Sequence, residues 1–145
     1  MIPEFDLDGN LPEGIHTGTE SDFFDRFTAP STRRGWLGDR VRELLALAKA
    51  TGHLERVFVW GSFVTSKESP NDIDLLLLMG ADFEVEETPR RCRRVFEHAS
   101  ARMAFQADVF WAKSSIGEET LRLWLETYQR ARDFRRRGII EVLLA

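Results

Sequence analysis

The chain has 145 residues, of which 43% are hydrophobic and 30% are charged, a composition that predicts one globular domain with a single core. No segment approaches the roughly 18 consecutive apolar residues of a membrane span, and the N-terminus lacks the features of a signal peptide, so we expect a cytoplasmic protein. The single cysteine, Cys92, excludes a disulfide framework and a zinc site built from several cysteines. The net charge of -4 argues against nucleic-acid binding by overall charge.

Charge is distributed unevenly along the chain. Residues 1–28 contain seven acidic side chains and a single basic one, Arg26. Two arginine clusters lie further along: Arg90, Arg91, Arg93 and Arg94, and then Arg130, Arg132, Arg135, Arg136 and Arg137. Such clusters are either solvated helix faces or surfaces for RNA or an acidic partner, and the sequence leaves both interpretations open.

The first third of the sequence predicts an arm followed by two helices. Residues 1–18 are rich in glycine and proline, which favour turns, so we expect a loop or an extended arm there. Helical spacing of apolar residues predicts a short helix over 19–27 and a longer one over 31–50. We therefore divide the chain into an N-terminal arm with a short helix, 1–30, and a core, 31–145.

Three strands are predicted in the middle of the chain. The run 56–60 is β-branched and aromatic and ends at Gly61 and Ser62, which indicates a strand followed by a tight turn. A second turn signal precedes 72–79, which has the apolar character of a buried strand. Apolar and polar residues alternate over 105–111, as in a strand with one buried face.

Helices are predicted between and after these strands. A helix over 88–103 would begin with a proline and would turn four side chains toward the core: Val95, Phe96, Ala99 and Met103. Another helix is expected over 115–128, and a last short strand over 138–144. This order of elements predicts the α/β (α+β) fold class, with helices packed on a sheet.

Acidic residues occur at the ends of the predicted strands. Asp72 and Asp74 are two positions apart, so on a strand they would present two carboxylates to one face, with Cα atoms about 7 Å apart. Such a pair suits Mg²⁺, which binds through one or two carboxylates together with substrate phosphates. Asp108, an acid in an otherwise apolar strand, is the candidate third ligand. Alternatively, Asp72 belongs to a turn, Asp74 merely opens a strand and Asp108 faces solvent.

A resemblance to a known superfamily suggests a function for this pattern. The segment GSFVTSKESPNDIDLLLL resembles the signature of the polymerase-beta-like (minimal) nucleotidyltransferase superfamily: a Gly-Ser turn, an acid-x-acid motif and a third acid on a later strand. Within it, the chain is similar to a group of uncharacterised bacterial nucleotidyltransferase-like proteins, through segments such as FDLDGNLPEGIH and YQRARDFRRRGIIEVLL. The resemblance implies a mixed β-sheet flanked by helices.

The resemblance also implies roles for individual residues. Gly61 and Ser62 would hold the nucleoside triphosphate, ATP for example, and Asp72 and Asp74 would bind Mg²⁺, or Mn²⁺ in its place. Asp108 would complete the metal site and help to activate the acceptor hydroxyl. Many small members carry an arginine-glycine pair shortly after the Gly-Ser turn, but this chain has Thr65-Ser66-Lys67 instead. Lys67 either supplies the missing positive charge or is an exposed loop lysine.

Other residue types give weaker signals. The three histidines, His16, His53 and His98, match no zinc spacing and are expected at the surface or in the core. Cys92 is expected to be a bystander thiol. The tryptophans, Trp36, Trp60, Trp111 and Trp124, lie at apolar spacings that predict core positions, although one of them could stack on a base.

Three functional hypotheses follow. The first is an Mg²⁺-dependent nucleotidyltransferase that moves a nucleoside monophosphate from an NTP to a hydroxyl of a protein or RNA acceptor. The second is a catalytically degenerate nucleotidyltransferase fold that binds a partner protein, as in a toxin-antitoxin pair or a phage-defence system. The third, an RNA-binding module without catalysis, depends only on the arginine clusters.

Overall fold

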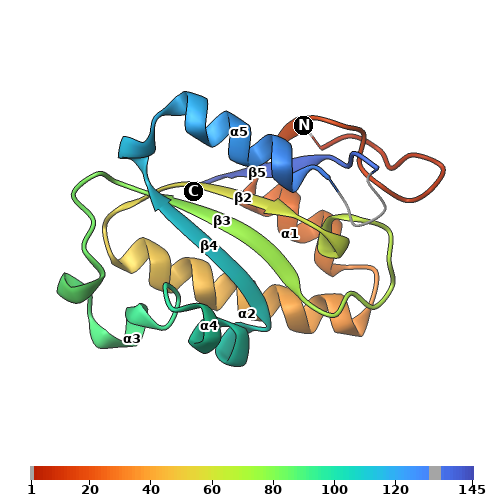
Figure 1. Ribbon diagram of the computed structural model, residues 1–145. Coiled ribbons are helices and arrows are strands. Elements are labelled where there is room, and N and C mark those ends of the chain that lie inside the picture. The colour runs from red at the N-terminus through yellow and green to blue at the C-terminus, as the bar shows by residue number, and fades with distance from the viewer. Residues whose placement is uncertain (1, 131–134) are drawn as a thin grey trace.

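A five-stranded mixed sheet organises the chain, in the order β1-β5-β2-β3-β4 (Figure 1). The computed structural model describes residues 2–130 and 135–145. β1 pairs with β5 and β3 with β4 in parallel, whereas β2 is antiparallel to both β5 and β3. The strands are β1 (Ile15–Thr19), β2 (Leu54–Trp60), β3 (Ile73–Met79), β4 (Ala107–Lys113) and β5 (Ile139–Leu143). The predicted α+β class, with a mixed sheet flanked by helices, is confirmed.

Helices cover both faces of the sheet. In Figure 1, α5 (Glu118–Tyr128) lies over one face, and α1 (Glu20–Thr28), α2 (Thr32–Ala50) and α4 (His98–Phe105) lie on the opposite side. Alternate residues of β3 serve the two cores: Leu75 and Leu77 pack toward α2, and Leu76 and Leu78 pack toward α5. No helix in the described part of the chain is long and apolar enough to cross a membrane.

Local capping explains where the first two helices begin. The Thr19 hydroxyl accepts a hydrogen bond from the Asp22 amide, and the Asp22 carboxylate accepts one from the Thr19 amide, which is a capping box. At the start of α2, the Ser31 hydroxyl accepts a hydrogen bond from the amide of Arg34, which is a simple N-cap. The predicted helices over 19–27 and 31–50 are therefore confirmed to within one residue at their ends.

The prediction that residues 1–18 form only a loop or arm is wrong for the last part of that segment. β1 (Ile15–Thr19) is an edge strand that pairs in register with β5, and Leu11 is buried in the main core. The local sequence contains Gly14 and Gly18, which lower strand propensity. The strand forms because β5, from the far end of the sequence, supplies its hydrogen-bonding partner.

The single helix predicted over 88–103 is broken. The structure has α3 (Arg90–Arg93) and, after a turn, α4 (His98–Phe105). The Phe96 carbonyl, which a continuous helix would use internally, accepts a hydrogen bond of 3.1 Å from Trp111 Nε1. Because α4 restarts in a new phase, the predictions for Ala99 and Met103 are wrong: both are exposed, and Ala101 and Phe105 face the core.

The remaining strands and the last helix match the predictions to within a few residues. The strand predicted over 105–111 is β4, which begins two residues later than predicted. The reason is that Phe105 ends α4 and Gln106 adopts a left-handed conformation with φ of 55°. β5 corresponds to the predicted strand over 138–144 and lies inside the sheet, between β1 and β2.

Candidate active site

Two of the predicted acids lie side by side at the start of neighbouring strands. Asp74 of β3 is paired in register with Asp108 of β4, and a side-chain hydrogen bond joins their carboxyl groups. Both lie on the sheet face that α5 covers further along, because they alternate with residues that face α2. Asp72 lies one residue before β3, and its charge also acts on Asp74. The structure therefore brings the three predicted acids together.

Asp74 has an unusual proton affinity. Burial, followed by the negative charges of Asp72 and Asp108, raises the pKa of Asp74 to about 7, although the positive charge of Arg102 acts in the opposite direction. The hydrogen bond to Asp108 contributes in the same upward direction. Near neutral pH, Asp74 therefore exchanges between the protonated and charged forms, and a bound cation would favour the charged form.

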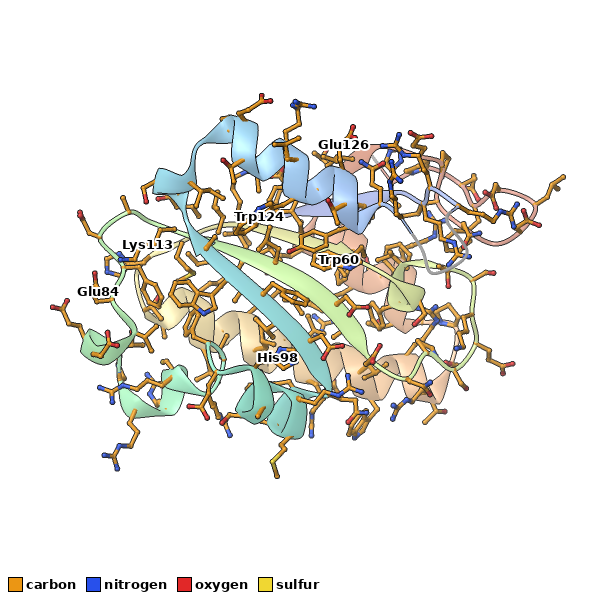
Figure 2. All side chains as sticks on the ribbon, in the orientation of Figure 1. Trp60, Glu84, His98, Lys113, Trp124 and Glu126 are labelled. Carbon is orange, nitrogen blue, oxygen red and sulfur yellow. The ribbon has the colours of Figure 1, made fainter. Side chains whose placement is uncertain are left out.

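Two basic side chains of α4 contact these acids, and sequence reasoning missed both. Arg102 Nη1 lies 2.8 Å from Asp72 Oδ2 and 3.4 Å from Asp108 Oδ2, so one guanidinium connects the two carboxylates. His98 Nε2 lies 3.6 Å from Asp108 Oδ1, and Figure 2 labels this histidine beside the start of β4. The two residues are four positions apart on one helix face, a spacing that could have indicated a joint role.

Gly61 brings the backbone of the Gly-Ser turn against Asp74. Its φ of 82° lies in the region that favours glycine, and a Cβ atom built there would collide with Asp74 Oδ2. Ser62 follows at once and opens a 3-10 turn, Ser62–Val64. The predicted turn residues and the acids are thus neighbours in space, although ten residues lie between Gly61 and Asp72 in the sequence.

A buried arginine supports the loop that follows the turn. Arg34 of α2 is only 1% exposed, and its guanidinium donates hydrogen bonds to five backbone carbonyls: those of Phe27, Ser62, Phe63, Thr65 and Lys67. Burial lowers the pKa of Arg34 from its ordinary value. Sequence reasoning did not single it out, because its acceptors are backbone groups that no residue pattern reveals.

The structure does not bring the Lys67 ammonium group to the acids. Lys67 is exposed, and the contacts that hold it are made by its backbone: its carbonyl accepts from Arg34 and its amide donates to the Thr65 hydroxyl. Among the described residues, its ammonium group forms no ion pair with Asp72, Asp74 or Asp108. Lys67 is therefore an exposed loop residue, and a role for its charge in holding a phosphate stays a prediction.

Aromatic rings line the site on the side of α5. Trp60 of β2 is paired in register with Asp74, and its ring stacks on Tyr128 with centroids 4.0 Å apart and an interplanar angle of 8°. Figure 2 shows Trp60 between the sheet and α5. Phe110, which is 40% exposed, lies between this stack and His98. The centroid of its ring is 6.0 Å from that of Trp60 and 6.0 Å from that of His98. A small cavity of about 60 Å³ adjoins Trp60, Gly61 and Tyr128.

Comparison with known proteins identifies the family of the chain. A family model described as a family of unknown function, DUF6932, matches residues 3–143. The chain belongs to the DUF6932 family. No curated protein and no solved structure gives a significant match. The residues that the DUF6932 model matches include both the N-terminal strand and the acids.

A metal site at these residues of the DUF6932 chain would depend on the carboxylates. Among residues 2–130 and 135–145, no three His, Cys, Asp or Glu side chains are arranged closely enough to hold a metal ion by themselves. Asp74 and Asp108 nevertheless supply adjacent hard oxygen donors, and Mg²⁺ commonly takes only one or two carboxylates with substrate phosphates as further ligands. The donor set therefore fits Mg²⁺ chemically when a phosphate-bearing substrate is also present.

The arginine clusters are partly neutralised within the fold. Arg94 pairs with Glu43, and Arg93 donates to the carbonyls of Thr88 and Glu86. In the second cluster, Arg135 contacts Asp8 and Arg136 contacts Glu13, both in the N-terminal segment, and Arg136 also contacts Glu126 of α5. Arg132 lies outside the described residues. The acidic arm and the second cluster thus offset each other, which sequence reasoning did not foresee.

Proposed function

We propose that this protein is a divalent-metal-dependent nucleotidyltransferase, which transfers a nucleoside monophosphate from an NTP to a hydroxyl of a protein or RNA acceptor. The observation that carries the proposal is the direct pairing of Asp74 with Asp108 beside the Gly61 turn. Adjacent carboxylates next to a glycine turn provide oxygen ligands for a cation and backbone amides for phosphate oxygens. The superfamily resemblance of the same residues supports this assignment.

The reaction needs few groups from the protein. Asp74 and Asp108 would hold Mg²⁺, with Asp72 nearby, and the bound ion would offset the negative charge of the triphosphate. The acceptor hydroxyl oxygen forms a bond to the α-phosphorus, the bond from that phosphorus to the bridging oxygen breaks, and pyrophosphate leaves. Asp108 accepts the hydroxyl proton, while the Gly61-Ser62 backbone orients the phosphates.

The test is transfer of label from the nucleotide. The protein is incubated with each α-labelled NTP, Mg²⁺ or Mn²⁺, and mixed tRNA or protein acceptors, beside Asp74→Asn and Asp108→Asn variants. We expect label on an acceptor only with the unsubstituted protein and a divalent cation. Transfer that persists in a doubly substituted Asp74→Asn, Asp108→Asn protein would exclude this mechanism.

A second candidate function is a degenerate nucleotidyltransferase fold that binds a partner protein, such as a toxin-antitoxin or phage-defence component. The Arg102 guanidinium favours it, because this group already connects Asp72 and Asp108 and can neutralise them without a metal. The two candidates differ in metal-dependent nucleotide binding. Equilibrium dialysis with a labelled NTP, with and without Mn²⁺, distinguishes them: binding that does not respond to the cation would favour the degenerate fold.

A further inference from the structure

α2 displays an exposed aromatic ring between two cations. Trp36 is 42% exposed, which contradicts the core position expected from the sequence. The guanidinium carbon of Arg33 lies 4.9 Å from the centre of the Trp36 ring, and that of Arg40 lies 5.3 Å from it. The spacing of three and four residues places all three side chains on one helix face. We refer to Arg33, Trp36 and Arg40 as the α2 patch.

Hydrogen bonds connect Arg33 of the α2 patch to the loop that leads into Asp72. Arg33 donates from Nε to the Pro70 carbonyl at 3.0 Å and from Nη2 to the Asn71 carbonyl at 2.6 Å. Asn71 immediately precedes Asp72, the acid that Arg102 holds at 2.8 Å. These bonds fix the Arg33 guanidinium in place, so this end of the α2 patch lies beside the loop that leads into the candidate active site.

We propose that the α2 patch binds a single-stranded nucleic acid and that this strand carries the acceptor hydroxyl, an inference that rests on the proposed function. An exposed tryptophan offers a stacking surface for any base, and flanking arginines attract the phosphates. A solvent-exposed tryptophan between two arginines has no role in the core. The α2 patch is a small local cluster of positive charge, and such a cluster is compatible with the overall net charge of -4.

Binding is measured without NTP, so that the result does not depend on catalysis. A fluorescein-labelled oligonucleotide of about twelve nucleotides, as RNA and as DNA in separate arms, is titrated with the protein while its anisotropy is recorded. We expect Trp36→Ala to weaken binding by about tenfold, because base stacking is lost, and Trp36→Phe to retain most of it. Arg40→Gln should make the plot of log binding constant against log salt concentration less steep by about 0.7, the value for one phosphate contact.

A matched control removes the same charge from the other face of the sheet. Arg122 of α5 is exposed and pairs with Glu119, so Arg122→Gln should leave affinity and salt slope unchanged. Circular dichroism establishes that each variant is folded. Equal affinity of Trp36→Ala and the unsubstituted protein for the oligonucleotide would overturn the proposal. Stronger competition by polyglutamate than by an unlabelled oligonucleotide would also overturn it, because that result indicates an acidic protein partner. Oligonucleotide binding without label transfer would contradict the proposed function and the acceptor role of the strand, but not the binding of nucleic acid by the α2 patch.

Discussion

Asp74 and Asp108 lie directly opposite each other on parallel strands, with a hydrogen bond between their carboxyl groups. Two carboxylates this close repel each other when both are charged, and burial increases the repulsion. Folding therefore favours a proton on Asp74, whereas catalysis with a metal would require the charged form. A site that lowers stability in this way is typical of a functional cluster, because a bound cation would offset the repulsion between the carboxylates.

The raised pKa of Asp74 predicts a specific pH dependence of stability. An aspartate in the unfolded chain has a pKa of about 4, whereas that of Asp74 in the folded protein is about 7. The contribution of Asp74 to the free energy of unfolding is thus fully present below about pH 4 and is lost as the pH rises to about 7. The total loss is up to about 4 kcal/mol. Urea denaturation across this range should show that the free energy of unfolding falls more for the unsubstituted protein than for Asp74→Asn. Parallel profiles for the two proteins would contradict the raised pKa.

Divalent cations should stabilise the folded protein at alkaline pH. At pH 8 the Asp74 carboxyl group is mostly charged, so a cation that binds only the folded state raises the melting temperature with its concentration. We expect this rise with Mn²⁺ in the presence of a nonhydrolysable NTP, and its loss in the doubly substituted Asp74→Asn, Asp108→Asn protein. Glu84→Gln, which changes an exposed acid paired with Lys113 elsewhere on the fold, should leave the rise intact. Differential scanning fluorimetry measures all three.

Arg102 should act as a competitor of the cation. Its guanidinium lowers the pKa of Asp74 and connects Asp72 to Asp108, so Arg102→Gln should raise that pKa further and free both carboxylates. Because the side chain is 40% exposed, we expect a loss of only about 1 kcal/mol in the free energy of unfolding. Mn²⁺ titration followed by calorimetry should show tighter binding in the variant at pH 8. If Mn²⁺ binding instead disappears, Arg102 supports the cation site rather than competing for it.

Gly61→Ala should disrupt the contact between the turn and Asp74. The new methyl group would occupy the space of Asp74 Oδ2, in addition to the strain of a positive φ, and we expect a loss of about 3 kcal/mol in the free energy of unfolding. Gly52→Ala is the matched control, because Gly52 has a similar φ of 78° and open space around it, so only the backbone strain of about 1 kcal/mol applies. Equal losses in the two variants would show that the Asp74 contact is unimportant.

Much of the fold could be predicted because its signals are local. The helix that Ser31 caps and the apolar strand that follows Asp72 are encoded in neighbouring residues, so the pattern of the sequence predicts both. β1 and the break before His98 could not be predicted in this way. The first depends on hydrogen bonds to β5 at the other end of the sequence, and the second on a hydrogen bond between Trp111 and Phe96.

The site shows the same division between local and long-range information. Asp72 and Asp74 are a visible pair in the sequence, and Asp108 stands out as an acid in an apolar strand. Arg102 and His98 reach these acids only because α4 restarts in a new phase after the break. Trp36 fits an apolar helical spacing, but the sequence cannot show that no other element covers that position.

Arg34 should be among the most sensitive positions of the chain, although it touches no acid of the site. Arg34→Gln would leave several buried carbonyls of the 62–67 loop without donors, and we expect a loss of about 3–5 kcal/mol in the free energy of unfolding. Arg42→Gln is the control from the same helix: its guanidinium is exposed and stacks on Phe24, so the loss should be about 1 kcal/mol or less. Urea denaturation measures both variants.

Arg34→Lys tests whether the loop matters for nucleotide binding, because the carbonyls that Arg34 holds follow the Gly-Ser turn. Lysine keeps the positive charge but has fewer directed donors. The variant should therefore remain folded yet bind the nucleotide more weakly. Nucleotide affinity equal to that of the unsubstituted protein would show that the loop holds its shape without the guanidinium.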